Sequence, residues 1–378
     1  MEIGRSKYDF LDKWSWKGKA IILTGARQVG KSTLMHQWLS KQKKKFSFFN
    51  ADEPETIETF EKISLPRLKQ IIGNNTILVI DEIQRIHNAG LLLKLIVDNF
   101  KDVQVIASGS SSLEISETIF EPLTGRHYNF HLFPMALNEF YKEKNEFEIK
   151  KYLPFHLVFG MYPEICINPV DARMNLKNMA AQYLYKDVLF WKDIRKPELL
   201  DKLLKLLAHQ IGSEVSIHEL ALKLKVKSET VVSYIDLLEK SFVIFRLNAF
   251  SGNERNEVTK MKKIYFYDNG IRNAVIGDFD PLEMRQDAGK LWENFMIAER
   301  IKVNSNIIGN SAQSFFWRNL NQSEVDYVEK ENKKLSAYEM KWTTHKKNYV
   351  TKAFTNAYPK TTTDVITPEN FGEFCRIV

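Results

Sequence analysis

The feature that most constrains this chain is the stretch at residues 25–32, Gly-Ala-Arg-Gln-Val-Gly-Lys-Ser, which fits the pattern GxxxxGK[ST] in full. The apolar run at residues 20–24 before it is typical of a strand, and residues 33–39 after it are typical of a helix. A strand, a glycine loop and a helix in this order predict a loop that binds phosphate. The glycines let successive N–H groups turn toward an anion, and the helix adds its positive N-terminal end.

Two side chains of this loop carry chemistry. Lys31 is placed to reach the β- and γ-phosphates of a nucleotide, and the Ser32 hydroxyl is placed to hold Mg²⁺. An ordinary glycine-rich turn is the alternative, but it does not account for Lys-Ser at the start of a helix. The residues predicted to bind ATP are Gly25, Ala26, Arg27, Gln28, Val29, Gly30, Lys31, Ser32 and Thr33.

The second half of a nucleotide site is a buried strand that ends in acid, and residues 76–82, Thr-Ile-Leu-Val-Ile-Asp-Glu, supply it. Four consecutive apolar residues suit a central parallel strand that is covered on both faces. Asp81 at its carboxyl end is predicted to orient the Mg²⁺ shell, because α/β sheets place ligands there. Glu82 is predicted to be the catalytic base that accepts a proton from attacking water. A strand with a solvated Asp-Glu end is the alternative, which the loop upstream disfavours.

Two more residues are candidates for the catalytic set. Residues 103–107 predict a third strand, followed by small polar residues at 108–112. Ser110 is predicted to position the lytic water or sense the γ-phosphate, although such serines also cap helices. Arg126 is a candidate to stabilise charge during phosphoryl transfer, in cis or from a neighbouring subunit. A surface or ion-paired arginine fits the sequence equally well.

Together these residues resemble the AAA-type P-loop ATPases. The pattern continues through Phe133-Pro134-Met135, Glu139-Phe140 and residues 263–270, Lys-Ile-Tyr-Phe-Tyr-Asp-Asn-Gly. In this longer form it is similar to prokaryotic ATPases that pair an AAA module with a C-terminal domain of unknown function, DUF4143. The resemblance covers most of the chain. It implies an α/β ATPase core with sheet order 5-1-4-3-2 that uses ATP and Mg²⁺.

Length and composition set broad limits. A chain of 378 residues suggests two or three domains, and 44% hydrophobic residues is typical of a globular protein. No apolar run approaches the ~20 residues needed to cross a bilayer, and the charged residues 1–13 predict no signal peptide. Two cysteines without metal or disulfide spacing favour a reducing cytoplasm. The net charge of +7 is compatible with a polyanionic partner.

We predict four parts in this chain. Residues 1–145 form the AAA-type ATPase domain, and residues 146–196 form a helical connector or lid. Residues 197–255 form a winged helix-turn-helix, and residues 256–378 form an α/β domain similar to restriction endonucleases.

The winged helix rests on three helical patterns followed by a strand at residues 242–247. Ser216 and Glu219 have the spacing of a capping box, which starts the second helix. The third helix has one apolar face, and residues on its exposed side are candidates to contact double-stranded DNA. These residues are Lys225, Lys227, Thr230, Ser233 and Tyr234. A protein-contact or purely structural module is the open alternative.

The C-terminal region holds a second constellation. Asp326 and Glu339 fall on two strands of a predicted hairpin, and Glu339 and Lys341 point to one face of the second strand. The two carboxylates can hold Mg²⁺ or Mn²⁺, and Lys341 can orient water or stabilise charge on a phosphodiester. Glu293, from the preceding helix, is predicted to complete the metal shell.

This second constellation resembles the PD-(D/E)xK nuclease superfamily. Its four signature positions are filled here, but Val325 stands where the family has proline. The resemblance implies a metal-dependent nuclease fold. A nuclease-like fold that binds without cutting, and a simple ion pair on an exposed strand, remain alternatives.

Two functions therefore stay open at the level of the sequence. The first is an ATPase that couples its nucleotide state to DNA binding or processing through the winged helix and the nuclease-like domain. The second is a nucleotide-dependent switch that binds a protein partner, with an inactive nuclease-like domain. AAA ATPases often form rings that share arginines, so an oligomer is compatible with both.

Overall fold

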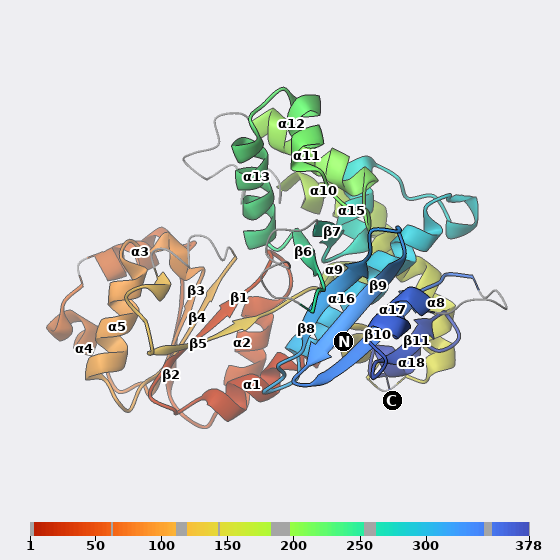
Figure 1. The fold of residues 1–378 in the computed structure, drawn as a ribbon. Coiled ribbons are helices and arrows are strands. Elements are labelled where there is room, and N and C mark those ends of the chain that lie inside the picture. Colours follow the sequence, from red (N-terminus) through yellow and green to blue (C-terminus); the bar gives the residue numbers. More distant parts are fainter. Residues whose placement is uncertain are drawn as a thin grey trace. The chain divides into compact units, whose positions relative to one another are not determined.

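The computed structural model describes residues 4–61, 63–110, 119–142, 144–182, 197–252, 262–343 and 350–377. The chain divides into two compact units (Figure 1). Among the described residues, the N-terminal unit comprises those up to residue 133 together with residues 240–242, and the C-terminal unit comprises the others. Among the helices that the structure describes, none is long and apolar enough to span a bilayer.

The N-terminal unit is built on a five-stranded sheet in which every pairing is parallel. The strand order is β2-β3-β4-β1-β5, which is the order 5-1-4-3-2 that the sequence resemblance implies. The order of a P-loop ATPase core is thereby confirmed. The elements of this unit are α1 (Lys7–Trp14), β1 (Ala20–Thr24), α2 (Lys31–Ser40), β2 (Phe46–Asn50), α3 (Pro54–Glu61), α4 (Leu65–Ile72), β3 (Ile77–Asp81), η1 (Ile83–Arg85), α5 (Ala89–Asn99), β4 (Gln104–Gly109) and β5 (His127–His131).

Helices cover both faces of this sheet, as Figure 1 shows. Helices α3, α4 and α5 bury Phe60, Leu68 and Leu92 against strand residues such as Ile22 and Ile80. The central strands β1, β3 and β4 are buried along their whole length, as their apolar runs predict. Strand β2 is at an edge and is half-buried, and sequence analysis did not predict it.

The C-terminal unit contains a six-stranded mixed sheet in the order β11-β10-β9-β8-β6-β7. Helices precede this sheet in the chain, and further helices separate β7 from β8 and β10 from β11. The elements are α7 (Leu137–Phe140), α8 (Glu146–Phe159), α9 (Pro163–Ile167), η3 (Pro169–Asp171), α10 (Ala172–Gln182), α11 (Pro197–His209), α12 (Ile217–Leu224), α13 (Ser228–Lys240), β6 (Ile244–Ala249), β7 (Lys262–Phe266), α15 (Asn269–Ile276), η5 (Leu282–Met284), α16 (Ala288–Ser305), β8 (Gln313–Arg318), β9 (Glu324–Glu331), β10 (Lys334–Met340), α17 (Lys352–Ala357), β11 (Thr362–Ile366) and α18 (Phe371–Phe374).

The segment after Phe133 belongs to the C-terminal unit, so the predicted boundary at residue 145 falls inside that unit. The Leu137 N–H donates to Glu299 Oε2 at 2.7 Å, and Lys302 Nζ donates to the Met135 carbonyl at 3.2 Å. Both Glu299 and Lys302 are buried on α16. The second bond gives Met135, the last residue of the Phe-Pro-Met part of the sequence pattern, a structural role.

The region predicted as a winged helix contains the three helices α11, α12 and α13, followed by the antiparallel hairpin of β6 and β7. Ser216 caps α12 by accepting from the Glu219 N–H at 3.3 Å, which is one of the two bonds of the predicted capping box. Strand β6 also pairs with β8, so the hairpin is part of the six-stranded sheet. The predicted boundary at residue 255 lies within this hairpin, and the winged-helix assignment stays a prediction.

The Tyr-Asp-Asn-Gly pattern holds two segments of the C-terminal unit together. Asp268 caps α15 through the Ile271 N–H at 3.1 Å and accepts from the Met161 N–H at 2.7 Å. A Cβ at Gly160 would lie 2.0 Å from an Asp268 carboxylate oxygen, and one at Gly270 would lie 2.2 Å from the Phe159 carbonyl oxygen. Glycine is therefore required at both positions by close approach.

Candidate functional site

The loop between β1 and α2 depends on glycine at two positions. Gly30 precedes α2 with φ +92°, in the left-handed region that glycine adopts without strain. A Cβ at Gly25 would lie 2.1 Å from the Leu132 carbonyl oxygen, so only glycine fits there. Ala26 and Val29 are fully buried and anchor the loop, whereas Gln28 is exposed.

Lys31 is the first residue of α2, and its side chain is buried in the loop. Its Nζ donates to the carbonyl oxygens of Gly25 at 3.0 Å and Ala26 at 2.8 Å. The ammonium group is thus held inside the loop, where an anionic ligand would meet it. Ser32 is half-buried and Thr33 is exposed on the same first turn of α2.

The carboxyl ends of β1, β3 and β4 meet at one edge of the sheet. Ala107 of β4 pairs with both Ile80 of β3 and Ile22 of β1, and Gly109 pairs with Thr24. The register therefore brings the start of the phosphate loop, the Asp-Glu pair after β3 and the serines after β4 to the same edge. The structure places the predicted Lys31, Ser32, Asp81, Glu82 and Ser110 at this edge.

Asp81 is buried, and its carboxylate is held by two neighbours. The Ser108 hydroxyl donates to Asp81 Oδ1, and the Glu82 N–H donates to the same oxygen at 3.1 Å. The Glu82 N–H also donates to Ser108 Oγ at 3.3 Å. Glu82 adopts φ 51° and ψ 44°, a left-handed conformation that is uncommon outside glycine. Non-glycine residues with a left-handed backbone are often found at functional sites.

The Glu82 side chain is connected to Ser110 through Gln84. The Gln84 amide nitrogen donates to Glu82 Oε2 at 2.6 Å and to Ser110 Oγ at 3.1 Å. Sequence reasoning singled out Ser110 but missed Ser108 as the partner of Asp81, and it gave Gln84 no role. The parallel pairing of β3 with β4 is the signal that would have found Ser108, because it places residue 108 beside residue 81.

Arg126 does not join the phosphate site of its own chain. The Arg126 carbonyl accepts from the Ala20 N–H, so Arg126 lies where β1 and β5 begin. The phosphate loop lies at the other end of β1, five residues along the strand. The Arg126 Nε pairs with Asp98 Oδ1 of α5 at 2.8 Å, and both side chains are partly exposed. The ion-paired alternative therefore describes Arg126 in this chain, and a role in trans stays a prediction.

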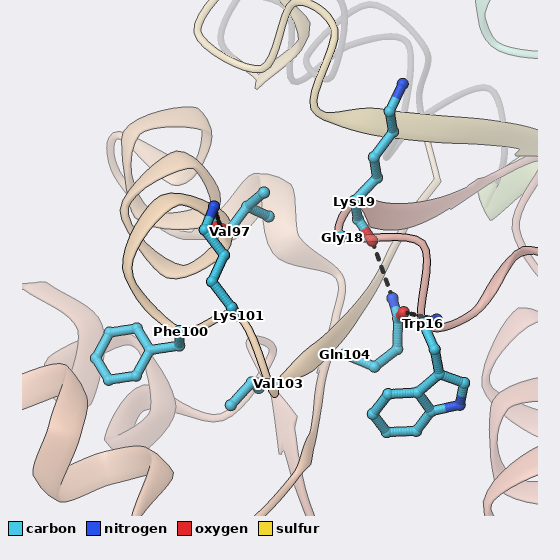
Figure 2. Close-up of a pocket in the computed structure, with 8 residues that line it drawn as sticks. All are labelled: Trp16, Gly18, Lys19, Val97, Phe100, Lys101, Val103 and Gln104. Carbon is cyan, nitrogen blue, oxygen red and sulfur yellow. Dashed lines mark hydrogen bonds between the residues drawn. The ribbon is translucent and has the colours of Figure 1, made fainter.

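Figure 2 shows the residues that line a small surface pocket, among them Lys19 and Gln104. These two residues lie at the amino ends of β1 and β4, whereas the phosphate loop follows the carboxyl end of β1. Gln104 connects β4 to the segment before β1. Its amide nitrogen donates to the Lys19 carbonyl at 3.1 Å, and its amide oxygen accepts from the Trp16 N–H at 2.6 Å. This position separates the pocket from the predicted nucleotide site.

The second constellation lies at the open end of the β9–β10 hairpin, opposite its turn. Lys341 Nζ lies 2.8 Å from Glu339 Oε2 and 3.5 Å from Asp326 Oδ2. The Met340 N–H donates to Asp326 Oδ2 at 2.8 Å, which fixes the two strands in this register. The structure therefore brings together the three residues that the sequence places on consecutive strands.

Glu293 of α16 belongs to the same constellation but has its own partners. Tyr265 donates its hydroxyl to Glu293 Oε1 at 2.6 Å, and Lys263 Nζ lies 3.4 Å from the same oxygen. The Lys263 ammonium also pairs with Glu324, although only 2% of this lysine side chain is exposed. Sequence reasoning placed Lys263 and Tyr265 in the longer sequence pattern, but it gave them and Glu324 no role in this constellation. The alternation of side chains along β7 and the acid at the start of β9 were the available signals.

Burial and charge repulsion raise the pKa values of two acids in this constellation. Burial and then the charge of Asp326 raise the pKa of Glu293 to about 7. The same two causes raise the pKa of Glu339 to about 8. Burial alone would lower the pKa of Lys341, but the charges of Asp326 and Glu339 outweigh it and raise that pKa. The constellation is therefore a place where added positive charge is favourable.

The donor chemistry fits a hard cation at both sites, since Ser32 and Asp81 at one site and three carboxylates at the other offer oxygen ligands. In the part of the chain that the structure describes, however, no three Asp, Glu, His or Cys side chains are arranged to hold one metal ion. At the C-terminal constellation, the carboxylates instead form ion pairs with Lys341 and Lys263 and a hydrogen bond with Tyr265. A metal ion there would have to displace some of these contacts.

The predicted DNA-contact residues lie on and before α13. Lys225, Lys227 and Ser233 are exposed, and Thr230 and Tyr234 are half-buried. Asp236 and Glu239 of α13 both pair with Arg246 of β6. Arg246 thus offsets the charge of these two acids within the unit, whereas Glu229 in the first turn of α13 is exposed.

The fold and the loop geometry define a P-loop ATPase core. An AAA domain model matches residues 17–141, and two domains of unknown function, DUF8612 and DUF4143, match residues 150–282 and 288–371. A Walker-type ATPase of Pyrococcus abyssi shares the fold, with a TM-score of 0.50 and 16% identity over 73% of this chain and 96% of that chain.

The chain carries an AAA domain followed by a DUF4143 domain, as the sequence resemblance predicts. Two uncharacterised proteins of Methanocaldococcus jannaschii are 27% and 28% identical to it, over 74% and 72% of this chain. The chain spans just under two thirds of these curated relatives, at 66% of the length of each.

Proposed function

We propose that this protein binds and hydrolyses ATP at the edge of the sheet formed by β1, β3 and β4. The observation that carries the proposal is the connection of Glu82 to Ser110 at the same edge as the phosphate loop. A loop that only binds a nucleotide needs Lys31 and Asp81 but has no need of a second, positioned carboxylate.

Each residue then has a defined task. Lys31 and the loop N–H groups hold the β- and γ-phosphates, while Ser32 and Asp81 supply oxygen ligands for Mg²⁺, which neutralises phosphate charge. Glu82 accepts a proton from the water that attacks the γ-phosphorus. The bond from this phosphorus to the β–γ bridging oxygen breaks, and ADP and phosphate form. Ser110 contacts the water or the γ-phosphate.

Nucleotide binding tests the first part of this proposal. Lys31→Ala removes the ammonium inside the loop, so we expect ATP binding and phosphate release to be lost. Lys43→Ala is the matched control, because Lys43 is an exposed lysine after the same helix. Wild-type protein that neither binds nor hydrolyses ATP, or a Lys31→Ala variant with full activity, would contradict the proposal.

We further propose that the C-terminal constellation acts on a phosphodiester with Mg²⁺ or Mn²⁺. The convergence of Lys341 on Glu339 and Asp326 favours it, and so do the raised pKa values of Glu293 and Glu339. Glu293, Asp326 and Glu339 would hold the ion once it had displaced some of their contacts to Tyr265, Lys263 and Lys341. The ion would then polarise the phosphate. Lys341, with 39% of its side chain exposed, is the lysine that a phosphate can reach.

Plasmid cleavage with Mg²⁺ or Mn²⁺, with and without ATP, tests this second activity. We expect wild-type protein to nick or linearise the plasmid and Lys341→Ala to abolish cleavage. Lys333→Ala, in the exposed turn between β9 and β10, should cleave like wild type. Absence of cleavage under every condition would leave the ATPase proposal intact and point to binding without cutting.

Duplex DNA is the partner proposed for the exposed lysines before and on α13. Phosphate contacts make the logarithm of DNA affinity fall with the logarithm of salt concentration, by about 0.9 per contact. The double variant Lys225→Ala, Lys227→Ala should therefore reduce this slope by about 1.8. A shallow slope that the variant does not change would favour the alternative function, a nucleotide-dependent switch on a protein partner.

A further inference from the structure

Gln84 occupies an unusual place beside the predicted base. It lies in η1, the short turn that follows Glu82 directly. Its amide nitrogen donates to Glu82 Oε2 at 2.6 Å and to Ser110 Oγ at 3.1 Å. Its amide oxygen is buried and has no hydrogen-bond partner among the described residues.

The orientation of this amide is set by its neighbours. An ionised carboxylate only accepts hydrogen bonds, so the amide nitrogen must face Glu82. The opposite orientation would put the amide oxygen against Glu82 Oε2. The two amide hydrogens are therefore committed to Glu82 and Ser110, and the oxygen remains as a free acceptor. An attacking water has hydrogens to donate to such an acceptor.

We propose that Gln84 is a positioning residue for ATP hydrolysis, which ties the Glu82 carboxylate to Ser110 at the end of β4. This inference rests on the proposed function. A glutamate side chain on a turn can adopt several rotamers, and the Gln84 amide restricts it to one. Correct placement of a catalytic base within about 1 Å is worth orders of magnitude in rate.

Two variants of Gln84 separate positioning from packing. Gln84→Ala removes the amide, and Gln84→Glu keeps its size but places a second carboxylate beside Glu82. We expect kcat to fall at least tenfold in both variants, with Gln84→Glu no more active than Gln84→Ala. The KM for ATP, the Kd of a fluorescent ATP analogue and the melting temperature should stay close to wild type. Gln70→Glu, at an exposed position on α4, is the matched control.

The possible outcomes are distinct. Wild-type protein that turns over no ATP contradicts the proposed function, and the inference falls with it. Wild-type turnover with an unchanged kcat in Gln84→Ala contradicts the inference alone. Near-normal kcat in Gln84→Glu beside a slow Gln84→Ala shows that the side chain only fills space. A loss of nucleotide affinity together with a lower melting temperature in the Gln84 variants shows a structural role. Either of these last two results overturns the inference.

Discussion

At the scale of single residues, Gly25 links the sequence pattern most directly to packing. Its backbone runs against the Leu132 carbonyl, which leaves no room for a side chain. The Leu132 N–H donates to the Thr24 carbonyl at 2.7 Å, so this contact continues the pairing of β1 with β5. Gly25 is therefore required by the packing of the loop itself, independently of any ligand.

Gly25→Ala should consequently destabilise the N-terminal unit. A Cβ 2.1 Å from a backbone oxygen cannot be relieved by a side-chain rotation, so we expect a loss of about 3 kcal/mol in unfolding free energy. Gly289→Ala is the control, because a Cβ there meets nothing within 4 Å. Denaturant unfolding measures both, and equal stability of the two variants would contradict this account of Gly25.

We expect His156 to make the free energy of unfolding depend on pH. Its Nδ1 lies 3.2 Å from the Gly160 carbonyl, and its Nε2 lies 2.6 Å from the Tyr141 hydroxyl. The carbonyl accepts and the hydroxyl donates, so a neutral imidazole satisfies both partners. Burial lowers the pKa of His156 to about 4. Between pH ~6.5 and 4 the unfolded chain binds the extra proton, so unfolding free energy decreases as pH falls.

The expected contribution of His156 is about 3 kcal/mol, present above pH ~6.5 and lost as the pH falls to 4. His156→Gln does not titrate, so its unfolding free energy should decrease less across this range. His131, whose pKa burial also lowers to about 4, remains in the variant and keeps part of the dependence. Denaturant unfolding at pH 7.5, 5.5 and 4.5 makes the comparison. Identical slopes for variant and wild type would show that His156 has no such role.

At the scale of elements, a buried ion pair connects α16 to β9. Arg300 donates to Glu329 through Nε at 2.8 Å and Nη2 at 2.7 Å, and Asn304 adds a third bond at 2.7 Å. Burial would raise the pKa of Glu329, but these bonds and the Arg300 charge outweigh it and lower that pKa. The pair therefore holds the helix that carries Glu293 against the strand that carries Asp326.

Glu329→Ala should cost about 3–5 kcal/mol of unfolding free energy, because it leaves the buried Arg300 charge without its partner. Glu331→Ala, at an exposed position on the same strand, should stay within about 0.5 kcal/mol of wild type. Thermal and denaturant unfolding test the difference. Similar stability for both variants would contradict the role of the ion pair.

The predictability of each element follows its burial pattern. Strands β1, β3 and β4 were predictable because central parallel strands read as unbroken apolar runs. The β9–β10 hairpin was predictable because a charged turn separates two alternating strands. Strand β2 was missed, since it is a half-buried edge strand of five residues. Its sequence, Phe-Ser-Phe-Phe-Asn, lacks a long apolar run.

The candidate sites show the same limit. The loop residues and the Asp-Glu pair follow local patterns, so they could be predicted from the sequence. The partners Ser108 and Gln84 depend on the register of β3 against β4, which no local pattern contains. Register also decides that Arg126 lies at the opposite end of β1 from the loop. Lys263 and Tyr265 were given no role in the second constellation because β7 lies far from α16 in sequence.

At the scale of the whole molecule, the two units carry different chemistry. The N-terminal unit holds the predicted nucleotide site, and the C-terminal unit holds the acid–lysine constellation and the three helices before β6. Strands on both sides of the predicted boundary at residue 255 share one sheet, so these C-terminal parts form one structural body.

Phosphate release under single-turnover conditions by wild type and Glu82→Gln tests the central claim, that this chain hydrolyses ATP with Glu82 as base. The variant keeps the size of the side chain and removes its ability to accept a proton. We predict that it binds ATP about as tightly as wild type but releases phosphate at least 100-fold more slowly, in line with the contribution of general bases. Glu55→Gln, an exposed residue on α3, should behave as wild type. Wild-type rates of phosphate release from Glu82→Gln would contradict the account.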